Sequence, residues 1–227
     1  MDRRGPSFLM RRPRTQREVW DGMEPSRLRD LCRPALYDGN LVLNKLPAME
    51  GRQSAQLAEL VTTLDLLNTL DLTESKEFVL ADINRVATAL CRRPASLRVL
   101  RLKGVRLEDQ GSRAIARIVL GQPNLEHLSL ADTKIVGRWG NKPKGFLRLC
   151  QNLRSTGILS LDLSDNNLGR VYRQRRWKAD IASIEFLGQI LEGLQSLREL
   201  RLRQNALCGV TAYEYGPFDD TGGKANP

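Results

Sequence analysis

The sequence predicts an α/β fold in which short parallel strands and helices alternate through a stack of similar units. A leucine frame with the spacing Leu-x-x-Leu-x-Leu recurs along the chain. Its equivalent residues Leu41, Leu70, Leu100 and Leu128 follow one another at steps of 29, 30 and 28 residues. Apolar residues at helical spacing follow the frames, as in residues 145–153. A period of this length is typical of folds built from one strand and one helix per repeat.

Five copies of the frame are clear, and a weaker sixth precedes them around Leu41, Leu43 and Leu46. In chain order the clear copies are Leu67/Leu70/Leu72/Ser75, Leu97/Leu100/Leu102/Val105/Leu107, Leu125/Leu128/Leu130/Thr133/Ile135, Ile158/Leu161/Leu163/Asn166/Leu168 and Leu197/Leu200/Leu202/Asn205/Leu207. Each frame is expected to be a strand whose alternating leucines point into the core. Because one unit cannot bury its own leucines, neighbouring units must stack to build one continuous core.

The frame resembles the leucine-rich repeat, and the frame with its following helix resembles the ribonuclease-inhibitor-like subclass. The match is best in residues 97–125, where Gly111 stands at a usual glycine position and Ile115 and Ile118 continue a helix face. The resemblance covers about residues 36–207. It implies a right-handed leucine-rich-repeat solenoid of about five to six repeats, with a curved parallel sheet and helices on the convex side.

The resemblance also assigns a role to the asparagine of the frame, whose side chain satisfies backbone groups in the turn after the strand. Asn166 and Asn205 match this position, whereas Ser75, Val105 and Thr133 depart from it. The turns of the earlier repeats are therefore expected to be less regular.

Three segments are expected along the chain. Residues 1–25 form a basic, disordered N-terminal arm with an alternative interpretation as a mitochondrial transit peptide. Residues 26–208 form the repeat domain, beginning with a capping helix over Ser26–Leu36 that has Ser26 at its N-cap. Residues 209–227 form a C-terminal tail without helical periodicity, which is either an improvised cap or the end of a truncated product.

Two insertions lengthen the last repeats, where the step between equivalent leucines grows to 33 and then 39 residues. Helical patterns resume at residues 145 and 179, with Asp180 as a candidate N-cap, so both insertions fall between a strand and a helix. They span residues 136–144 and 169–178 and contain no acidic residue. Their cations and aromatic residues are Arg138, Trp139, Lys142, Lys144, Arg170, Tyr172, Arg173, Arg175, Arg176, Trp177 and Lys178.

These insertions predict a basic, aromatic rim, because consecutive repeats stack at about 5 Å and both insertions leave the same edge of the sheet. Arginine binds phosphate or carboxylate in a bidentate manner, and aromatic faces stack on bases or anchor a peptide. The alternative is two solvated loops whose charge serves solubility. The formal net charge is +10; Met1–Arg17 carries +5 and the two insertions carry +8, so the rest of the chain is slightly acidic.

The sheet face is the second candidate surface, since it is the usual partner-binding surface of the family. Its outward positions carry both signs of charge, which suits a protein partner better than a polyanion. The predicted residues are Asp71, Arg101, Ser129, Asp162 and Arg201, flanked by Lys103, His127, Asp132, Glu199 and Arg203. A generic polar sheet face is the alternative.

Nothing in the sequence predicts an enzyme, a cofactor or a metal site. His127 is the only histidine and belongs to no nucleophile motif, and the four cysteines form no CxxC pair. The cysteines are expected to be free, half-buried thiols near helix ends in a reducing compartment. No apolar run is long enough for a transmembrane segment. The expected location is cytoplasmic, with the mitochondrion and the nucleus as alternatives.

The functional hypothesis is a non-catalytic protein–protein interaction module, an adaptor or scaffold in an intracellular complex, that uses the sheet face and the rim. It is expected to be monomeric outside its complex. The alternative is binding of RNA or another acidic polymer by the rim, as in a component of a ribonucleoprotein.

Overall fold

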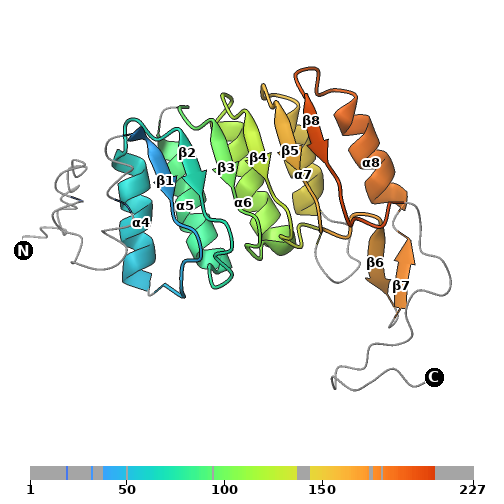
Figure 1. Cartoon of the computed structure of the whole chain (residues 1–227), viewed down its shortest axis with the longest axis horizontal. Coiled ribbons are helices and arrows are strands. Elements are labelled where there is room, and N and C mark those ends of the chain that lie inside the picture. Colours follow the sequence, from blue (N-terminus) through green and yellow to red (C-terminus); the bar gives the residue numbers. More distant parts are fainter. Residues whose placement is uncertain are drawn as a thin grey trace, which may run out of the picture.

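Six short strands form one open, entirely parallel sheet (Figure 1). The computed structural model describes residues 19, 32, 38–49, 51–93, 95–136, 144–173, 176–179 and 181–207. The strands are β1 (Asn40–Val42), β2 (Thr69–Asp71), β3 (Val99–Arg101), β4 (His127–Ser129), β5 (Ser160–Asp162) and β8 (Glu199–Arg201), in the spatial order β1-β2-β3-β4-β5-β8. Their central residues are the predicted leucines of the six frames, which pair directly from each strand to the next. The predicted strands, including the weak first one, are confirmed.

One helix follows each of the first five strands of this sheet and lies on its rear side in the view of Figure 1. The helices are α4 (Gly51–Thr63), α5 (Leu80–Arg92), α6 (Glu108–Gly121), α7 (Lys144–Leu153) and α8 (Ile181–Leu191). The helical patterns expected to resume at residues 145 and 179 correspond to α7 and α8. Neighbouring helices pack side by side because neighbouring strands do, which is how a repeat fold grows in one dimension.

The core lies between the sheet and the helices and is a single apolar cluster. In β3, Leu100 is completely buried while the next residue, Arg101, is exposed, as alternation in a strand requires. In α6, Ile115 and Ile118 are buried against the sheet. Leu200 and Leu202 of the last frame are only partly buried, so the core is less complete at that end.

Each turn after a strand contains one residue in the left-handed region, at the same place in every frame. These residues are Lys45, Glu74, Gly104, Asp132, Asp165 and Gln204, with φ between 52° and 77°. Only Gly104 among them is a glycine, so five side chains adopt a conformation that costs energy in isolation. The backbone contacts between neighbouring repeats compensate for that cost.

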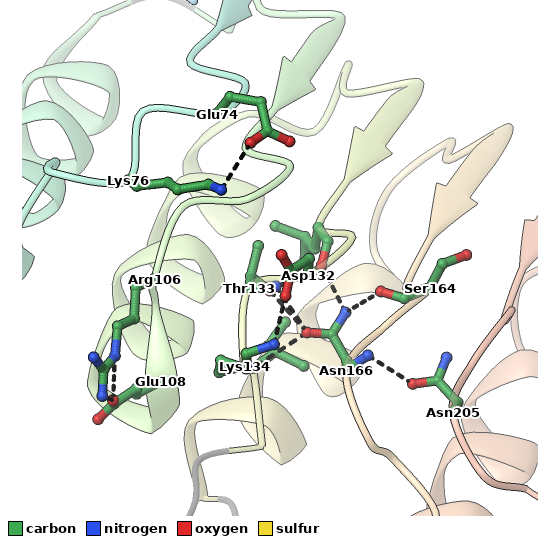
Figure 2. Close-up of polar contacts among 12 residues, drawn as sticks. Glu74, Lys76, Arg106, Glu108, Asp132, Thr133, Lys134, Ser164, Asn166 and Asn205 are labelled. Carbon is green, nitrogen blue, oxygen red and sulfur yellow. Dashed lines mark hydrogen bonds and ion pairs between the residues drawn. The ribbon is translucent and has the colours of Figure 1, made fainter. Parts of the chain in front are cut away.

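The asparagine position lies directly after this left-handed residue, and its side chains bond backbone atoms of two repeats (Figure 2). The Asn166 side-chain oxygen accepts the N–H groups of Thr133 and Ile135 at 3.1 and 3.2 Å. Its amide nitrogen donates to the carbonyl oxygen atoms of Leu130 and Leu163 at 2.7 and 3.0 Å. The role predicted for the asparagine is confirmed.

Hydroxyl side chains replace the asparagine in earlier repeats. The Ser75 hydroxyl donates to the Leu43 carbonyl oxygen at 3.0 Å, and the Thr133 hydroxyl donates to the Leu130 carbonyl oxygen at 2.8 Å. A second left-handed residue follows the asparagine position at Lys134, Asn167 and Ala206, and none follows Ser75 or Val105. The expectation of less regular early turns is therefore correct for the second half of the turns at Ser75 and Val105. It is wrong for the turn at Thr133 and for the first half of all three turns.

The second insertion is a hairpin, where the sequence predicts a loop. Strands β6 (Arg170–Arg173) and β7 (Arg176–Ala179) pair antiparallel between β5 and α8, and the hairpin extends below the sheet in Figure 1. Val171, Tyr172 and Trp177 favour strands, and a two-residue connection is the commonest for a hairpin. Most of the first insertion, residues 137–143, lies outside the described residues.

The N-terminal segment is described at only two positions, Val19 and Cys32, which are both helical and buried. Val19 falls within the predicted arm, so at this position the chain packs on the core instead of extending from it. Asp180 and most of the predicted capping helix and tail lie outside the described residues.

The cysteines differ in exposure, contrary to the expectation that all are half-buried. Cys32 and Cys150 are completely buried, whereas Cys91 is exposed near the end of α5. All three are free thiols, as predicted. Cys208 lies outside the described residues.

Candidate functional site

The outward residues of the sheet form one straight row across the strands. The pairing register joins Asp71, Arg101, Ser129, Asp162 and Arg201 directly, in this order. They alternate with buried leucines, so the same pattern that builds the core places them on the open face. The row also includes an exposed apolar residue on β1, Val42, which is absent from the predicted set; its place between Leu41 and Leu43 could have indicated it.

Two aspartates of this row take part in the turns after their strands. Asp71 accepts the N–H of Thr73 at 2.9 Å, and Asp162 accepts the N–H of Ser164 at 3.0 Å. The Asp71 side chain is only 10% exposed and lies 3.5 Å from the Arg101 guanidinium. Asp71 is thus a structural residue that neutralises part of Arg101, while Asp162 remains more accessible.

The charges at the β8 end of the row are linked to one another. Glu199 forms an ion pair with Arg201, and its other oxygen accepts the hydroxyl of Ser160 at 2.9 Å. The hydrogen bonds from Ser160 and Arg201 lower the pKa of the Glu199 carboxyl group. This keeps the carboxylate charged beside Arg201, and the end of the row presents both signs of charge.

The flanking cations Lys103 and Arg203 lie two residues beyond the row, just after β3 and β8. Both are exposed, and neither forms an ion pair with another residue in the described ranges. His127 is exposed on β4, one position before Leu128. Three strand steps separate β3 from β8, which is about 14 Å at the usual strand spacing. Two basic columns therefore flank the more neutral strands β4 and β5.

The corners between strands and helices carry paired charges in the regular repeats, as Figure 2 shows. Lys76 lies 3.5 Å from Glu74, and Arg106 lies 2.8 Å from Glu108. Asp132 pairs with Lys134 at the β4 corner. Asp132, expected on the sheet face, is instead one of the left-handed turn residues.

The predicted rim is only partly described. Lys144 is exposed at the start of α7, whereas Arg138, Trp139, Lys142 and Arg175 lie outside the described residues. The juxtaposition of the two insertions is therefore still a prediction.

In the hairpin, Tyr172 pairs directly with Trp177, and Arg173 pairs with Arg176. Alternation along the strands places positions 170, 172, 177 and 179 on one face and positions 171, 173, 176 and 178 on the other. Three of the four residues on the second face are cations: Arg173, Arg176 and Lys178.

A buried arginine, Arg93, is absent from the residues that the sequence pattern singles out. It is 7% exposed, and its guanidinium donates to the carbonyl oxygen atoms of Leu64 at 2.5 Å and Val61 at 3.4 Å and to the Ser96 hydroxyl at 2.9 Å. Burial lowers the pKa of Arg93, and the charge of Asp65 partly offsets this. These carbonyl groups lie at the end of α4, where a cation is favourable. Arg93 therefore stabilises the contact between two repeats.

Neither a metal site nor a membrane-spanning helix is found in the part of the chain that the structure describes. No group of three or more histidine, cysteine, aspartate or glutamate residues there could hold a metal ion. No helix within the same ranges has the length and apolar character needed to cross a bilayer.

This geometry is that of a repeat protein, with an open parallel sheet on one side and helices on the other. No protein-family model and no curated protein sequence matches the chain. The solved structure of "Leiomodin-1 Actin-Binding Site 2 (ABS2)" is similar, with a TM-score of 0.53 and 12% sequence identity over 75% of this chain and 90% of that chain. At this identity the likeness shows the fold alone, and with the sheet it fits a leucine-rich-repeat type of fold.

Proposed function

We propose that this protein is a non-catalytic interaction module that binds a protein partner on its sheet face. The observation that carries the proposal is the row Asp71, Arg101, Ser129, Asp162 and Arg201, which is continuous across five strands and, beyond Asp71, accessible to solvent. A surface with both signs of charge at fixed spacing selects a partner of complementary pattern and suppresses others. The structural neighbour is named as an actin-binding site, which supports protein binding at a coarse level.

The row gives the partner surface a definite pattern. Arg101 with Lys103, and Arg201 with Arg203, suit two acidic groups about 14 Å apart, and Asp162 between them suits a basic group. We place the repeats in the ribonuclease-inhibitor-like subclass of right-handed solenoids, with an adaptor or scaffold role inside the cell. The basic residues of the hairpin and of residues 136–144 would extend the contact beyond the sheet.

A second candidate function is binding of RNA or another acidic polymer by the rim. The direct pairing of Arg173 with Arg176 favours it, because it places two cations together near the hairpin tip. Reversing both charges should abolish such binding. The same change should leave a partner bound through the sheet face largely in place.

The test uses a photo-crosslinking amino acid at Ser129, the centre of the row, in the full chain expressed in its native cells. We expect one discrete protein to be crosslinked there and to be lost when Arg101→Glu and Arg201→Glu are combined. Purified partner should then bind the wild-type chain in calorimetry, with affinity lowered at least tenfold, about 1.4 kcal/mol, in the double variant.

The matched control places the same crosslinker at Gln110, which is exposed on α6 on the other side of the molecule. If both positions capture the same set of proteins, the sheet face has no special role. If Ser129 captures RNA alone, the polyanion hypothesis replaces protein binding.

A further inference from the structure

The outer surface of α5, α6 and α7 is mainly basic, a property that the sequence pattern did not reveal. Most exposed charged residues on α5, α6 and α7 are cations; the exception is Glu108 in the first turn of α6, whose side chain is 44% exposed. These residues are Arg85, Arg92, Arg113, Arg117, Lys144 and Arg148, which we call the helix-face cations. The helices lie side by side with their other faces buried against one sheet, so these cations share one solvent-facing surface (Figure 1).

The acids of these helices neutralise only part of that charge, at Arg85 and Arg113. Asp82 of α5 is buried and accepts from Arg85 at 3.2 Å. Asp109 pairs with Arg113 at 2.9 Å, and Glu108 pairs with Arg106. Both acids of α6 lie in its first turn. Beyond that turn, the only charged residues of α6 are Arg113 and Arg117, and those of α7 are Lys144 and Arg148.

Contacts between the helices fix several of these arginines in place. The guanidinium of Arg117 donates to the side-chain oxygen of Asn84 on α5 at 2.7 Å, and that of Arg85 donates to the Ser54 hydroxyl on α4 at 3.1 Å. Each arginine reaches across to the preceding helix. A guanidinium has five N–H donors, so donors remain for a ligand on the solvent side. Lys144 and Arg148 form no ion pair within the described residues.

The close packing of α6 and α7 brings their cations together. The N–H of Gly145 donates to the Asp109 carboxylate at 2.5 Å, and the Asn152 side chain donates to the Ala116 carbonyl oxygen at 2.7 Å. A Cβ atom at position 145 would lie 2.1 Å from the Asp109 carbonyl oxygen, so the absence of a side chain permits this approach. Arg113, Arg117, Lys144 and Arg148 therefore share one surface over two adjoining helices.

We propose that the helix-face cations bind the phosphate backbone of a double-stranded nucleic acid. The excess of positive charge across three helices contrasts with the more evenly mixed signs of the sheet face and is typical of a surface for a polyanion. Five of the six cations are arginines, which suit phosphate. The exposed residues of these three helices include no aromatic side chain, so bases have no stacking platform there and single strands are disfavoured. Binding through phosphates alone is independent of sequence.

The proposal is separate from the sheet-face function, and together they describe a protein that joins a protein partner to a nucleic acid. The experiment measures fluorescence anisotropy of labelled RNA and DNA duplexes of about 20 base pairs with the full chain, between about 50 and 200 mM KCl. Both duplexes should bind with similar affinity, more tightly than a single strand of the same length. The logarithm of the binding constant should fall linearly with the logarithm of salt concentration.

The decisive variant is Arg117→Glu with Arg148→Glu. Its affinity should fall at least tenfold, and the salt slope should decrease by about 2, since two phosphate contacts are lost. The matched control is Arg98→Glu with Arg198→Glu, which changes the net charge equally near the starts of β3 and β8. The control should bind within about twofold of wild type at fixed salt. Thermal unfolding of both variants separates loss of binding from loss of fold.

Three results would overturn the proposal. Equal loss in the two double variants would show that total charge alone drives binding. Tighter binding to the single strand than to the duplexes would indicate that nucleic acid binds at the aromatic residues of the rim instead. Sedimentation with anionic phospholipid vesicles without duplex binding would identify a membrane surface as the ligand. Crosslinking from Ser129 reports on the sheet-face function independently of all three.

Discussion

Asn166 shows how much one side chain can determine in a stacked fold. It is 1% exposed, and its amide satisfies N–H and carbonyl groups in two repeats at once. Its own N–H donates to the Asn205 side-chain oxygen at 2.9 Å, so the two asparagines form a ladder. Without these bonds the buried turn would contain unpaired backbone groups, each costing about 1–3 kcal/mol.

Replacing this amide should destabilise the protein strongly. We expect Asn166→Ala to lower the free energy of unfolding by about 3 kcal/mol, because several buried groups lose their partners together. Urea denaturation followed by circular dichroism measures it. Asn152→Ala is the control, since Asn152 is partly exposed and its side chain makes one bond, to Ala116; its cost should be about 1 kcal/mol. Equal costs would contradict the role given to the ladder.

The cysteines should differ in reactivity according to burial. Burial raises the pKa of Cys32 and of Cys150 to about 12, and the pKa of Cys91 is raised by partial burial and lowered by the charge of Arg117. A raised pKa leaves the thiol protonated, and therefore unreactive, at every pH below it. At pH 8, iodoacetamide should modify Cys91 first among these three, and all three only after unfolding in urea. Peptide mass spectrometry identifies the sites, and fast native labelling of Cys150 would refute the assignment.

At the scale of elements, glycines mark where two helices approach most closely. Gly145 opens α7 against Asp109 of α6, where an added Cβ atom would lie 2.1 Å from a carbonyl oxygen. Gly188 lies inside α8, with no atom within 4 Å of a Cβ atom built there. Glycine at position 145 therefore permits close packing of two helices. Glycine at position 188 only lowers the stability of its helix, since glycine is a poor helix former.

Alanine at the two positions should have opposite effects. Gly145→Ala should destabilise the protein by about 2 kcal/mol, because α7 must move away from α6. Gly188→Ala should stabilise it by about 0.5–1 kcal/mol through the lower entropy of the unfolded chain. Thermal unfolding of the two variants under identical conditions makes the comparison. A loss of stability at position 188, or a gain at position 145, would show that the packing described for these helices is incorrect.

At the scale of the whole molecule, the sequence predicts those features that recur with the period of the leucine frame. Each strand centre followed from a leucine that must alternate with an outward residue, and the row on the sheet face followed from the same alternation. The asparagine ladder followed because a buried turn needs a polar side chain at one fixed position. The hairpin was not predicted from the sequence. Val171 and Trp177 favour strands, but the many cations beside them are more typical of a solvated loop.

The helix-face cations were missed because net charge says nothing about distribution. The body of the chain is close to neutral, yet acids such as Glu74 and Asp132 lie at the corners while Arg117 and Arg148 lie on the helices. Sequence periodicity places a residue on a face of its own helix. It does not show that the exposed faces of three helices with different sequences share an excess of positive charge. Arg93 was missed for a related reason, because its partners are carbonyl groups that no side-chain pattern reveals.

The stack should be least stable at its β8 end. The N–H groups of Leu43, Leu72, Leu102, Leu130 and Leu163 each donate to a carbonyl oxygen of the next strand, at 2.7 to 2.9 Å. The equivalent N–H of Leu202 has no such acceptor among the described residues, and its side chain is only partly buried. Local opening needs little free energy where both burial and hydrogen bonding are incomplete.

Native-state hydrogen exchange tests this gradient. We expect the amide of Leu202 to exchange far faster than those of Leu130 and Leu163, although all three occupy the same position in the frame. The opposite edge strand serves as the control, because Leu43 is completely buried and its N–H is bonded to the carbonyl oxygen of Asp71 at 2.7 Å. If Leu202 is instead as protected as Leu163, a further strand must pair with β8, either from elsewhere in this chain or from a second copy of it. Repeating the measurement across a dilution series decides between these two sources, since only pairing with a second copy depends on protein concentration.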